Sequence, residues 1–113
     1  MKKSDKKTEK AIRESLTEVC DMALENVSGF KWLTHCVNYS NFPGSLSIVC
    51  VFQSNDELLL AKKNHMDNYL CKIIKETLER SDIKISDTKK RILFDTEENC
   101  LIENNGNWKE RLN

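Results

Sequence analysis

The chain has 113 residues, of which 39% are hydrophobic and 32% charged, and its 18 Lys and Arg residues balance 18 Asp and Glu residues. This length suits one domain, and a zero net charge argues against a dedicated nucleic-acid-binding domain, which is usually basic. No apolar run approaches the ~20 residues that a membrane span requires. No signal-peptide-like apolar stretch follows the Lys-rich N-terminus. We therefore expect a cytoplasmic protein that does not enter a membrane.

The N-terminal part of the chain predicts a tail followed by an amphipathic helix. Residues 1–8 are polar and Lys-rich, which is typical of a flexible tail, and residues 9–113 are expected to form a single α+β domain. The helix should begin near Ser4 or Thr8 and end before Gly29, a residue that favours helix ends. Its apolar residues recur at steps of three and four, the spacing of one helical face. They are Ile12, Leu16, Val19, Cys20, Ala23, Leu24 and Val27.

Residues 30–52 contain two β-prone runs around a turn-forming segment, which predicts a β-hairpin. Two registers are open. Pairing Val37 with Ile48 collects apolar side chains on one face, whereas pairing Cys36 with Cys50 mixes the faces. Because a one-residue slip exchanges the two faces of a strand, burial favours the first register. The expected buried face then carries Leu33, His35, Val37, Tyr39, Leu46, Ile48, Cys50 and Phe52.

The second half of the chain predicts one long helix and two strands. Ser-Asn-Asp-Glu at residues 54–57 is a helix-start signal, with carboxylates near the positive end of the helix dipole. The helix should run to about Arg80, with a bend or a break in the polar segment 62–65. Residues 91–95 and 100–102 predict two further strands joined by a turn.

This order of elements, α-β-β-α-β-β, predicts the α+β class. We expect a mainly antiparallel four-stranded sheet with two helices on one face. The other face would then stand open to solvent, as antiparallel sheets commonly do.

No motif predicts catalysis, a metal or a cofactor. His35 and His65 have no paired ligand at zinc spacing. In the favoured register His35 faces Cys50 across the hairpin, but a thiol on a buried face is inert. The five cysteines include no Cys-x-x-Cys pair and are typical of buried apolar residues in a reducing compartment.

Basic clusters and one strand face predict a surface for a partner. Trp32, Thr34 and Asn38 alternate away from the expected core face, and residues 89–91 form a basic run at the start of the third strand. The predicted partner surface is Trp32, Thr34, Asn38, Lys89, Lys90 and Arg91. An open sheet face with an exposed aromatic residue is a natural docking patch.

Several segments resemble a small bacterial family that carries the label "Fis family transcriptional regulator". The resemblance rests on Trp-Leu-Thr-His at 32–35, Val-Asn-Tyr at 37–39, Phe-Pro at 42–43, Val-Cys-Val-Phe at 49–52 and Asn-Gly-Asn-Trp at 105–108. It covers most of the chain and implies a regulatory role. It assigns no DNA-contacting residue.

These observations predict a small non-enzymatic binding or regulatory protein. Its partner would be another protein, or a second copy in a homodimer, bound through the open sheet face or an edge strand. The alternative is a DNA- or RNA-binding regulator that uses the Lys and Arg clusters on phosphates.

Overall fold

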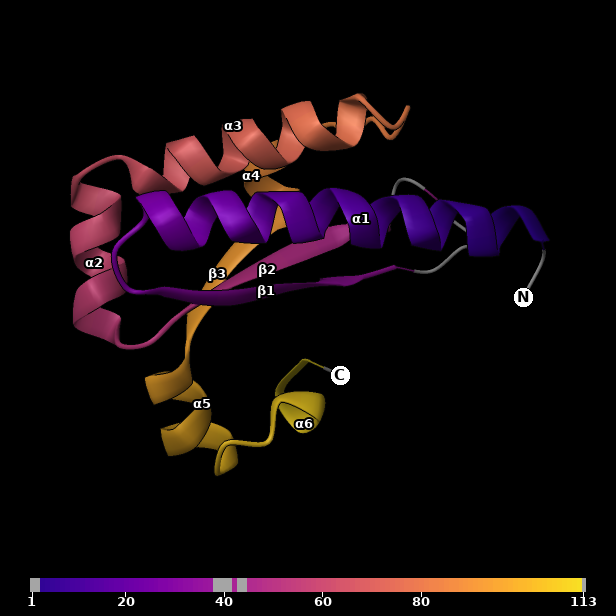
Figure 1. The fold of residues 1–113 in the computed structure, drawn as a ribbon. Helices are drawn as coiled ribbons and strands as arrows, with labels where there is room; N and C mark the ends of the chain where they lie inside the picture. The colour runs from indigo at the N-terminus through magenta and orange to yellow at the C-terminus, as the bar shows by residue number, and fades with distance from the viewer. Residues whose placement is uncertain (1–2, 38–41, 43–44, 113) are drawn as a thin grey trace.

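The computed structural model describes residues 3–37, 42 and 45–112. Three strands and six helices follow one another along this part of the chain (Figure 1). They are α1 (Lys3–Asn26), β1 (Phe30–Cys36), β2 (Ser47–Phe52), α2 (Asn55–Lys63), α3 (Met66–Glu79), α4 (Thr88–Arg91), β3 (Ile92–Thr96), α5 (Glu97–Asn104) and α6 (Trp108–Leu112).

The α+β class is confirmed, but the predicted four-stranded antiparallel sheet is wrong. The sheet has three strands in the order β1-β2-β3. Strands β1 and β2 form the expected antiparallel hairpin, and β3 joins β2 in parallel. The parallel pairing requires a long crossover, which α2, α3 and α4 supply.

The fourth predicted strand, residues 100–102, lies inside helix α5. The Thr96 hydroxyl accepts a hydrogen bond from the backbone N–H of Asn99 at 3.0 Å, so Thr96 caps the helix. Glu97 and Glu98 then occupy the first turn, where carboxylates favour a helix. This cap and these charges outweigh the β-prone side chains that follow.

The hairpin register differs by two residues from the predicted one. Leu33 lies opposite Cys50, and His35 lies opposite Ile48 rather than Cys50. A shift of two residues leaves every side chain on its predicted face, because the side-chain period of a strand is two. Tyr39, which the favoured register placed on the same face, lies outside the described residues.

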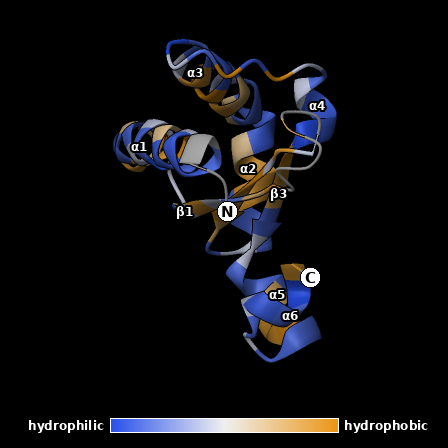
Figure 2. Cartoon of the chain, turned by 90° about the vertical axis from the view of Figure 1, so that its right-hand side faces the viewer, coloured by the Kyte–Doolittle hydropathy of each residue, from blue (hydrophilic) through white to orange (hydrophobic). Residues whose placement is uncertain are grey.

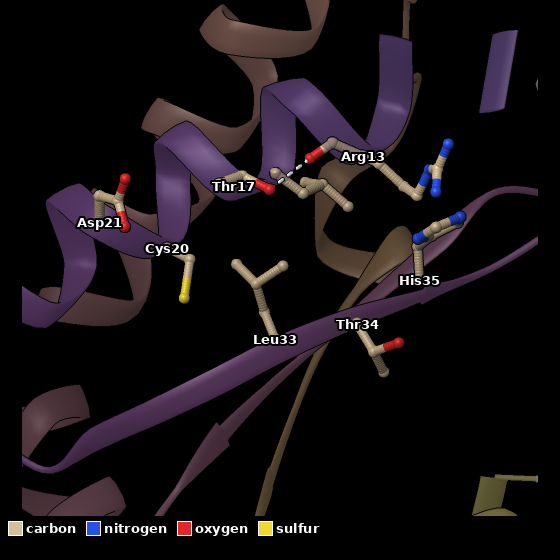
Figure 3. A pocket seen from close by; sticks show the side chains of 8 residues that line it. Arg13, Thr17, Cys20, Asp21, Leu33, Thr34 and His35 are labelled. Carbon is tan, nitrogen blue, oxygen red and sulfur yellow. Dashed lines mark hydrogen bonds between the residues drawn. The ribbon is translucent and has the colours of Figure 1, made fainter. Parts of the chain in front are cut away.

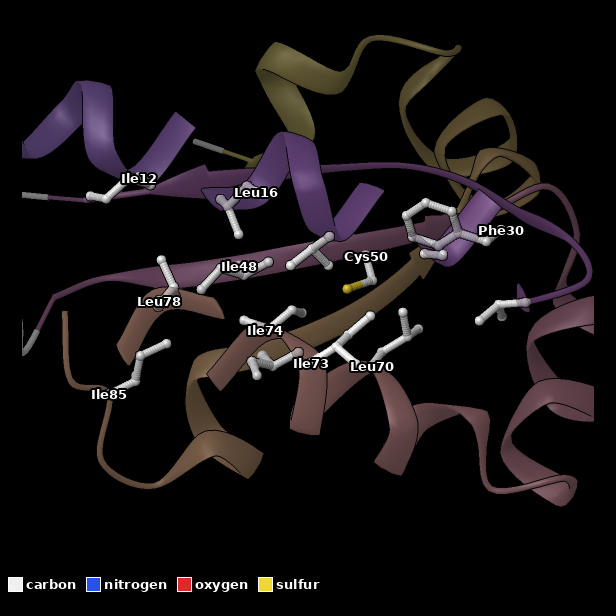
Figure 4. Close-up of a cluster of buried hydrophobic side chains, with 14 of the residues drawn as sticks. Ile12, Leu16, Phe30, Ile48, Cys50, Leu70, Ile73, Ile74, Leu78 and Ile85 are labelled. Carbon is white, nitrogen blue, oxygen red and sulfur yellow. The ribbon is translucent and has the colours of Figure 1, made fainter. Parts of the chain in front are cut away.

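Helices α1 and α3 lie side by side over one face of the sheet (Figure 1). Between them and the sheet sits the main core, in which Ile48 and Cys50 of β2 meet Leu70 and Ile74 of α3 (Figure 4). Figure 2 shows hydrophobic residues gathered on the sheet and on the inward faces of these helices, with hydrophilic residues outside. The amphipathic pattern of α1 is therefore explained by burial, since Ile12 and its apolar companions face this core.

The predicted bend between residues 62 and 65 separates α2 from α3. Ser54 caps α2 by accepting a hydrogen bond from the backbone N–H of Glu57, 3.2 Å away. His65 ends the connection in the left-handed conformation, with φ of 62°. This residue turns the chain so that α3 can run back beside α1.

Helix α1 begins at Lys3, so most of the segment assigned to a tail is helical. The first turn of α1 extends beyond the sheet (Figure 1). In the part of the chain that the structure describes, no helix has the length and apolar character needed to cross a membrane.

Candidate binding groove

The residues of the predicted partner surface do not form one patch. Trp32 and Thr34 lie on β1, and the basic run 89–91 forms most of α4, which leads into β3 on the opposite edge of the sheet. Strand β2 separates them. The register places Trp32 level with Asp95, at the far end of β3 from α4. Asn38 lies outside the described residues.

Trp32 does not stand free on an open face, because the C-terminal helices cover it. Its ring meets that of Trp108 edge to face, with centroids 4.9 Å apart. Both indole N–H groups donate to the same oxygen, Oε1 of Glu97, at 3.0 Å from Trp32 and 2.7 Å from Trp108. The aromatic residue expected to bind a partner is thus used within the fold.

A groove lies between α1 and the free edge of β1. It has a volume of about 420 Å³, and Figure 3 shows the side chains that line it. Helix α1 supplies one wall and β1 the other. Its lining combines an apolar floor with polar rims and consists of Arg13, Leu16, Thr17, Cys20, Asp21, Leu33, Thr34 and His35.

The outer edge of β1 pairs with no strand among the described residues, since β2 is its sole neighbour in the sheet. A backbone hydrogen bond joins Leu33 to the Cys20 thiol of α1. The backbone of Leu33 therefore faces the groove rather than β2. Because antiparallel pairs alternate between inward and outward backbone groups, His35 presents its backbone on the same side. These outward groups form a template for an added strand.

Burial shifts the pKa values of two side chains of the groove wall, His35 and Cys20. Burial lowers the pKa of His35 below its ordinary value; nearby Glu9 opposes this shift and Arg13 adds to it. Burial raises the pKa of Cys20, and Asp21 raises it further, against the hydrogen bond from Leu33. The groove thus favours an uncharged imidazole and an uncharged thiol near neutral pH.

A second concave site lies at the free edge of β3. Lys62 of α2 and Lys89 of α4 both line a pocket of about 450 Å³, with Asp67, Asn68, Cys71 and the first residues of β3. The Lys62 ammonium lies 5.9 Å from the centre of the Phe94 ring. The structure therefore brings together two basic clusters that are far apart in sequence and adds an aromatic ring.

The cysteine and histidine side chains do not assemble a reactive centre. Cys50 is fully buried, and burial raises its pKa far above the ordinary value for a thiol. His35 faces Ile48 across the hairpin, so the Cys50–His35 pair considered from the sequence is not opposed. Within the described residues, no three His, Cys, Asp or Glu side chains gather in a way that could hold a metal ion.

The sequence predicted the helix and the strand that form the groove, but it did not predict the groove itself. The sequence placed Cys20 on the apolar stripe of the helix and Leu33 on the buried face of the hairpin, and it singled out neither Arg13 nor Asp21. The available signal was the width of the α1 stripe, since Cys20 stands beside the Leu16–Val19 row and extends it toward one side.

Comparisons of the chain with protein-family models, with curated proteins and with solved structures give no match. The resemblance to the family labelled as Fis regulators stays a prediction. The function is therefore argued from the geometry of the two strand edges.

Proposed function

We propose that this protein is a non-enzymatic binding protein that takes an extended segment of a partner protein into the groove between α1 and β1. The observation that carries the proposal is the free edge of β1 beside an apolar floor made by Leu16, Cys20 and Leu33. The proposal places the protein in a reducing compartment such as the cytoplasm. Its five free cysteines support that placement.

Strand addition requires two features that the groove combines. Main-chain hydrogen bonds to an unpaired edge supply affinity, and a recess beside that edge selects alternate side chains of the incoming strand. The backbone groups of Leu33 and His35 provide the edge. The wall of α1 provides the recess, because Cys20 and Leu33 meet across its floor (Figure 3).

The predicted sheet face is less suited to this role than the edge. Trp32 donates a hydrogen bond to Glu97 and packs against Trp108, so a partner that needed this indole would have to break that bond and displace the Trp108 ring. At the edge of β1, a partner would displace only the hydrogen bond between the Leu33 backbone and the Cys20 thiol, which is a weak bonding group. A groove that exists before binding also reduces the ordering cost of association.

The proposal is tested by selecting random twelve-residue segments from a displayed library on the wild-type protein and on Thr17→Trp. Thr17 is exposed at the rim, so the larger side chain should fill the groove without disturbing the core. Lys72→Trp adds the same bulk at an exposed position of α3 outside the groove. Thermal melts of both variants verify that they fold.

We expect peptides that bind the wild-type protein and Lys72→Trp but lose at least tenfold in affinity for Thr17→Trp. In amide NMR spectra of the labelled protein, they should shift Leu33, His35 and their neighbours. A library that yields no binder, or binders that ignore Thr17→Trp, contradicts the proposal.

The non-enzymatic part of the proposal has its own test. Cys50 is the nucleophile that a cysteine enzyme would need on the central strand, and burial keeps its thiol protonated. Under native conditions, mass spectrometry should find Cys50 unlabelled by iodoacetamide until urea unfolds the chain. Rapid labelling of Cys50 in the folded protein would instead favour a cysteine-dependent enzyme.

A second candidate function is the binding of single-stranded nucleic acid at the edge of β3. The observation that favours it is the meeting of Lys62 and Lys89 around Phe94, since bases stack on aromatic rings while cations contact phosphates. The carboxylate of Asp67 in the same pocket opposes it. We therefore rank it below the protein partner.

Fluorescence anisotropy with labelled oligo-dT and oligo-U tests this second candidate. Binding at low salt that weakens toward physiological salt and is lost in Lys89→Glu would support it. Lys109→Glu, at an exposed position of α6, is the matched control. Absence of binding by the wild-type protein at low salt, or equal loss in the two variants, would reject it.

A further inference from the structure

The two ends of the groove carry opposite charges. Arg13 lies at the end near His35, and Asp21 lies at the other end (Figure 3). In the described part of the chain neither side chain makes an ion pair. Their neighbours on α1 do, as Lys10 with Glu14 and as Glu18 with Arg80. Arg13 and Asp21 are the two charged side chains that line the groove, and both remain available to a partner.

The separation of these charges matches a short stretch of extended chain. Arg13 and Asp21 are eight positions apart on α1, and a helix rises ~1.5 Å per residue, which places them about 12 Å apart along its axis. A strand rises ~3.3 Å per residue, so four residues of an extended segment cover about the same length. Residues i, i+2 and i+4 of a strand share one face. One face of a bound strand can therefore meet Arg13, the apolar floor and Asp21 in turn.

We infer that the segment bound in the groove carries the pattern acidic–x–apolar–x–basic, read from its N-terminus. This inference rests on the proposed function and specifies which side chains the bound segment of the partner carries. The acidic residue meets Arg13, the apolar residue sits on Cys20 and Leu33, and the basic residue meets Asp21.

The direction of the pattern follows from the chain path. Strand β1 runs toward His35, so a strand added antiparallel to it begins at the Arg13 end and finishes at the Asp21 end. Antiparallel pairing is slightly more stable per residue than parallel pairing. A segment with the two charges exchanged would place like charges together at both ends.

The discrimination between the two charge orders should be about tenfold. Two exposed ion pairs contribute roughly 0.2–1 kcal/mol each, and ~1.4 kcal/mol corresponds to a factor of ten in affinity. Glu9, which acts on His35 together with Arg13, and Lys31, two residues before Leu33 on β1, carry the opposite signs to Arg13 and Asp21. They keep the expected preference from being larger.

The test uses two capped nine-residue peptides of identical composition, with the central sequences Glu-Thr-Leu-Thr-Lys and Lys-Thr-Leu-Thr-Glu. Each is titrated into the labelled full chain and followed by amide NMR. The wild-type protein should bind the first peptide about tenfold more tightly. The double variant Arg13→Glu, Asp21→Lys should prefer the second peptide, because both groove charges are reversed. Both positions are exposed and unpaired, so the variant should fold as the wild type does.

The outcomes separate this inference from the proposed function. If both proteins bind the two peptides equally, or if selected library peptides occupy the groove without this pattern, the charge inference is wrong and the groove proposal stands. If neither the library nor the two peptides shift the amides of β1, both fall. A reversal of preference in the double variant supports both together.

Discussion

The indole rings of Trp32 and Trp108 meet edge to face, and both donate a hydrogen bond to the same oxygen of Glu97. Trp32 belongs to the first strand and Trp108 to the last helix, so this contact joins segments that are far apart in sequence. Glu97 begins α5 and lies between them. One carboxylate oxygen therefore fixes the position of the C-terminal helices against the sheet.

Replacing Glu97 should loosen this junction. Hydrogen bonds to a charged group contribute about 1.5–3 kcal/mol each, so Glu97→Ala should lower the free energy of unfolding by about 2 kcal/mol or more. Glu97→Gln keeps a neutral acceptor and should cost less. The chain has only two tryptophans, so its fluorescence reports this site directly. Glu110→Gln, at an exposed position of α6, is the control. Equal losses in Glu97→Ala and the control would contradict the assignment.

The Arg111–Asp95 pair should be the second attachment of the C-terminal helices. Arg111 Nε lies 2.6 Å from Oδ2 of Asp95 and its NH2 lies 3.1 Å from Oδ1, with the two side chains 17% and 16% exposed. Lysine cannot reproduce a two-pronged contact. Arg111→Lys should cost about 2 kcal/mol, because it leaves a largely buried carboxylate half-satisfied.

Hydrogen exchange measures this effect locally. The amides of α6 should exchange faster in Arg111→Lys, while those of α3 should keep their protection. Lys109→Ala, an exposed neighbour on the same helix, should leave both unchanged. Uniform acceleration across the whole chain in Arg111→Lys would show that the pair supports the entire fold instead.

Adding a side chain at Gly29 should destabilise the fold more than adding one at Gly106. Both have positive φ, 85° and 81°. A Cβ on Gly29 would lie 2.7 Å from the Glu57 side chain, and one on Gly106 would meet nothing within 4 Å. Gly29→Ala should therefore cost about 2 kcal/mol or more, and Gly106→Ala about 1 kcal/mol. Urea unfolding gives both values, and equal losses would rule out the predicted clash with Glu57.

Acid should weaken the fold through His35. Burial lowers the pKa of this imidazole below its ordinary value of 6.5, so the unfolded chain takes up its proton first as the pH falls. The stability contributed by the neutral form is complete above pH 6.5 and is lost as the pH falls below it. His35→Gln should reduce the drop in melting temperature between pH 7.5 and about 5.5.

A histidine elsewhere provides the comparison. His65→Asn removes an exposed histidine from the turn between α2 and α3, and asparagine accepts the left-handed backbone found there. This variant should keep the drop caused by His35, because His35 remains in place. If His35→Gln and the wild-type protein lose stability equally over this pH range, His35 does not carry the effect.

Local sequence signals predicted most of the elements. The stripe from Ile12 to Val27 predicted α1, the signal at Ser54 predicted the start of α2, and the polar segment before Met66 predicted the break ahead of α3. These predictions depend on neighbours three or four residues apart. Such information is present in the chain before it folds.

The predictions were wrong mainly where the structure depends on contacts between segments that are distant in sequence. The residues around Ile92 carry no local signal that β3 pairs in parallel with β2, because the direction of pairing follows from the path of the crossover. The missed helix α5 is different, because Thr96 followed by two glutamates is the same kind of signal as that used at Ser54. Leu101 and Ile102 drew the strand prediction, yet both are exposed on α5. The groove could not be predicted, because it depends on which edge of β1 stays unpaired.

The central strand, β2, is joined to its two neighbouring strands by connections of very different length. Ten residues join β1 to β2, whereas residues 53–91 separate β2 from β3. Closing a loop costs about 0.6 kcal/mol more for each doubling of its length, and the longer connection must also order α2 and α3. We expect the hairpin to form before the folding transition state and β3 to join after it. Ile48→Val should then slow folding, and Ile92→Val should mainly speed unfolding.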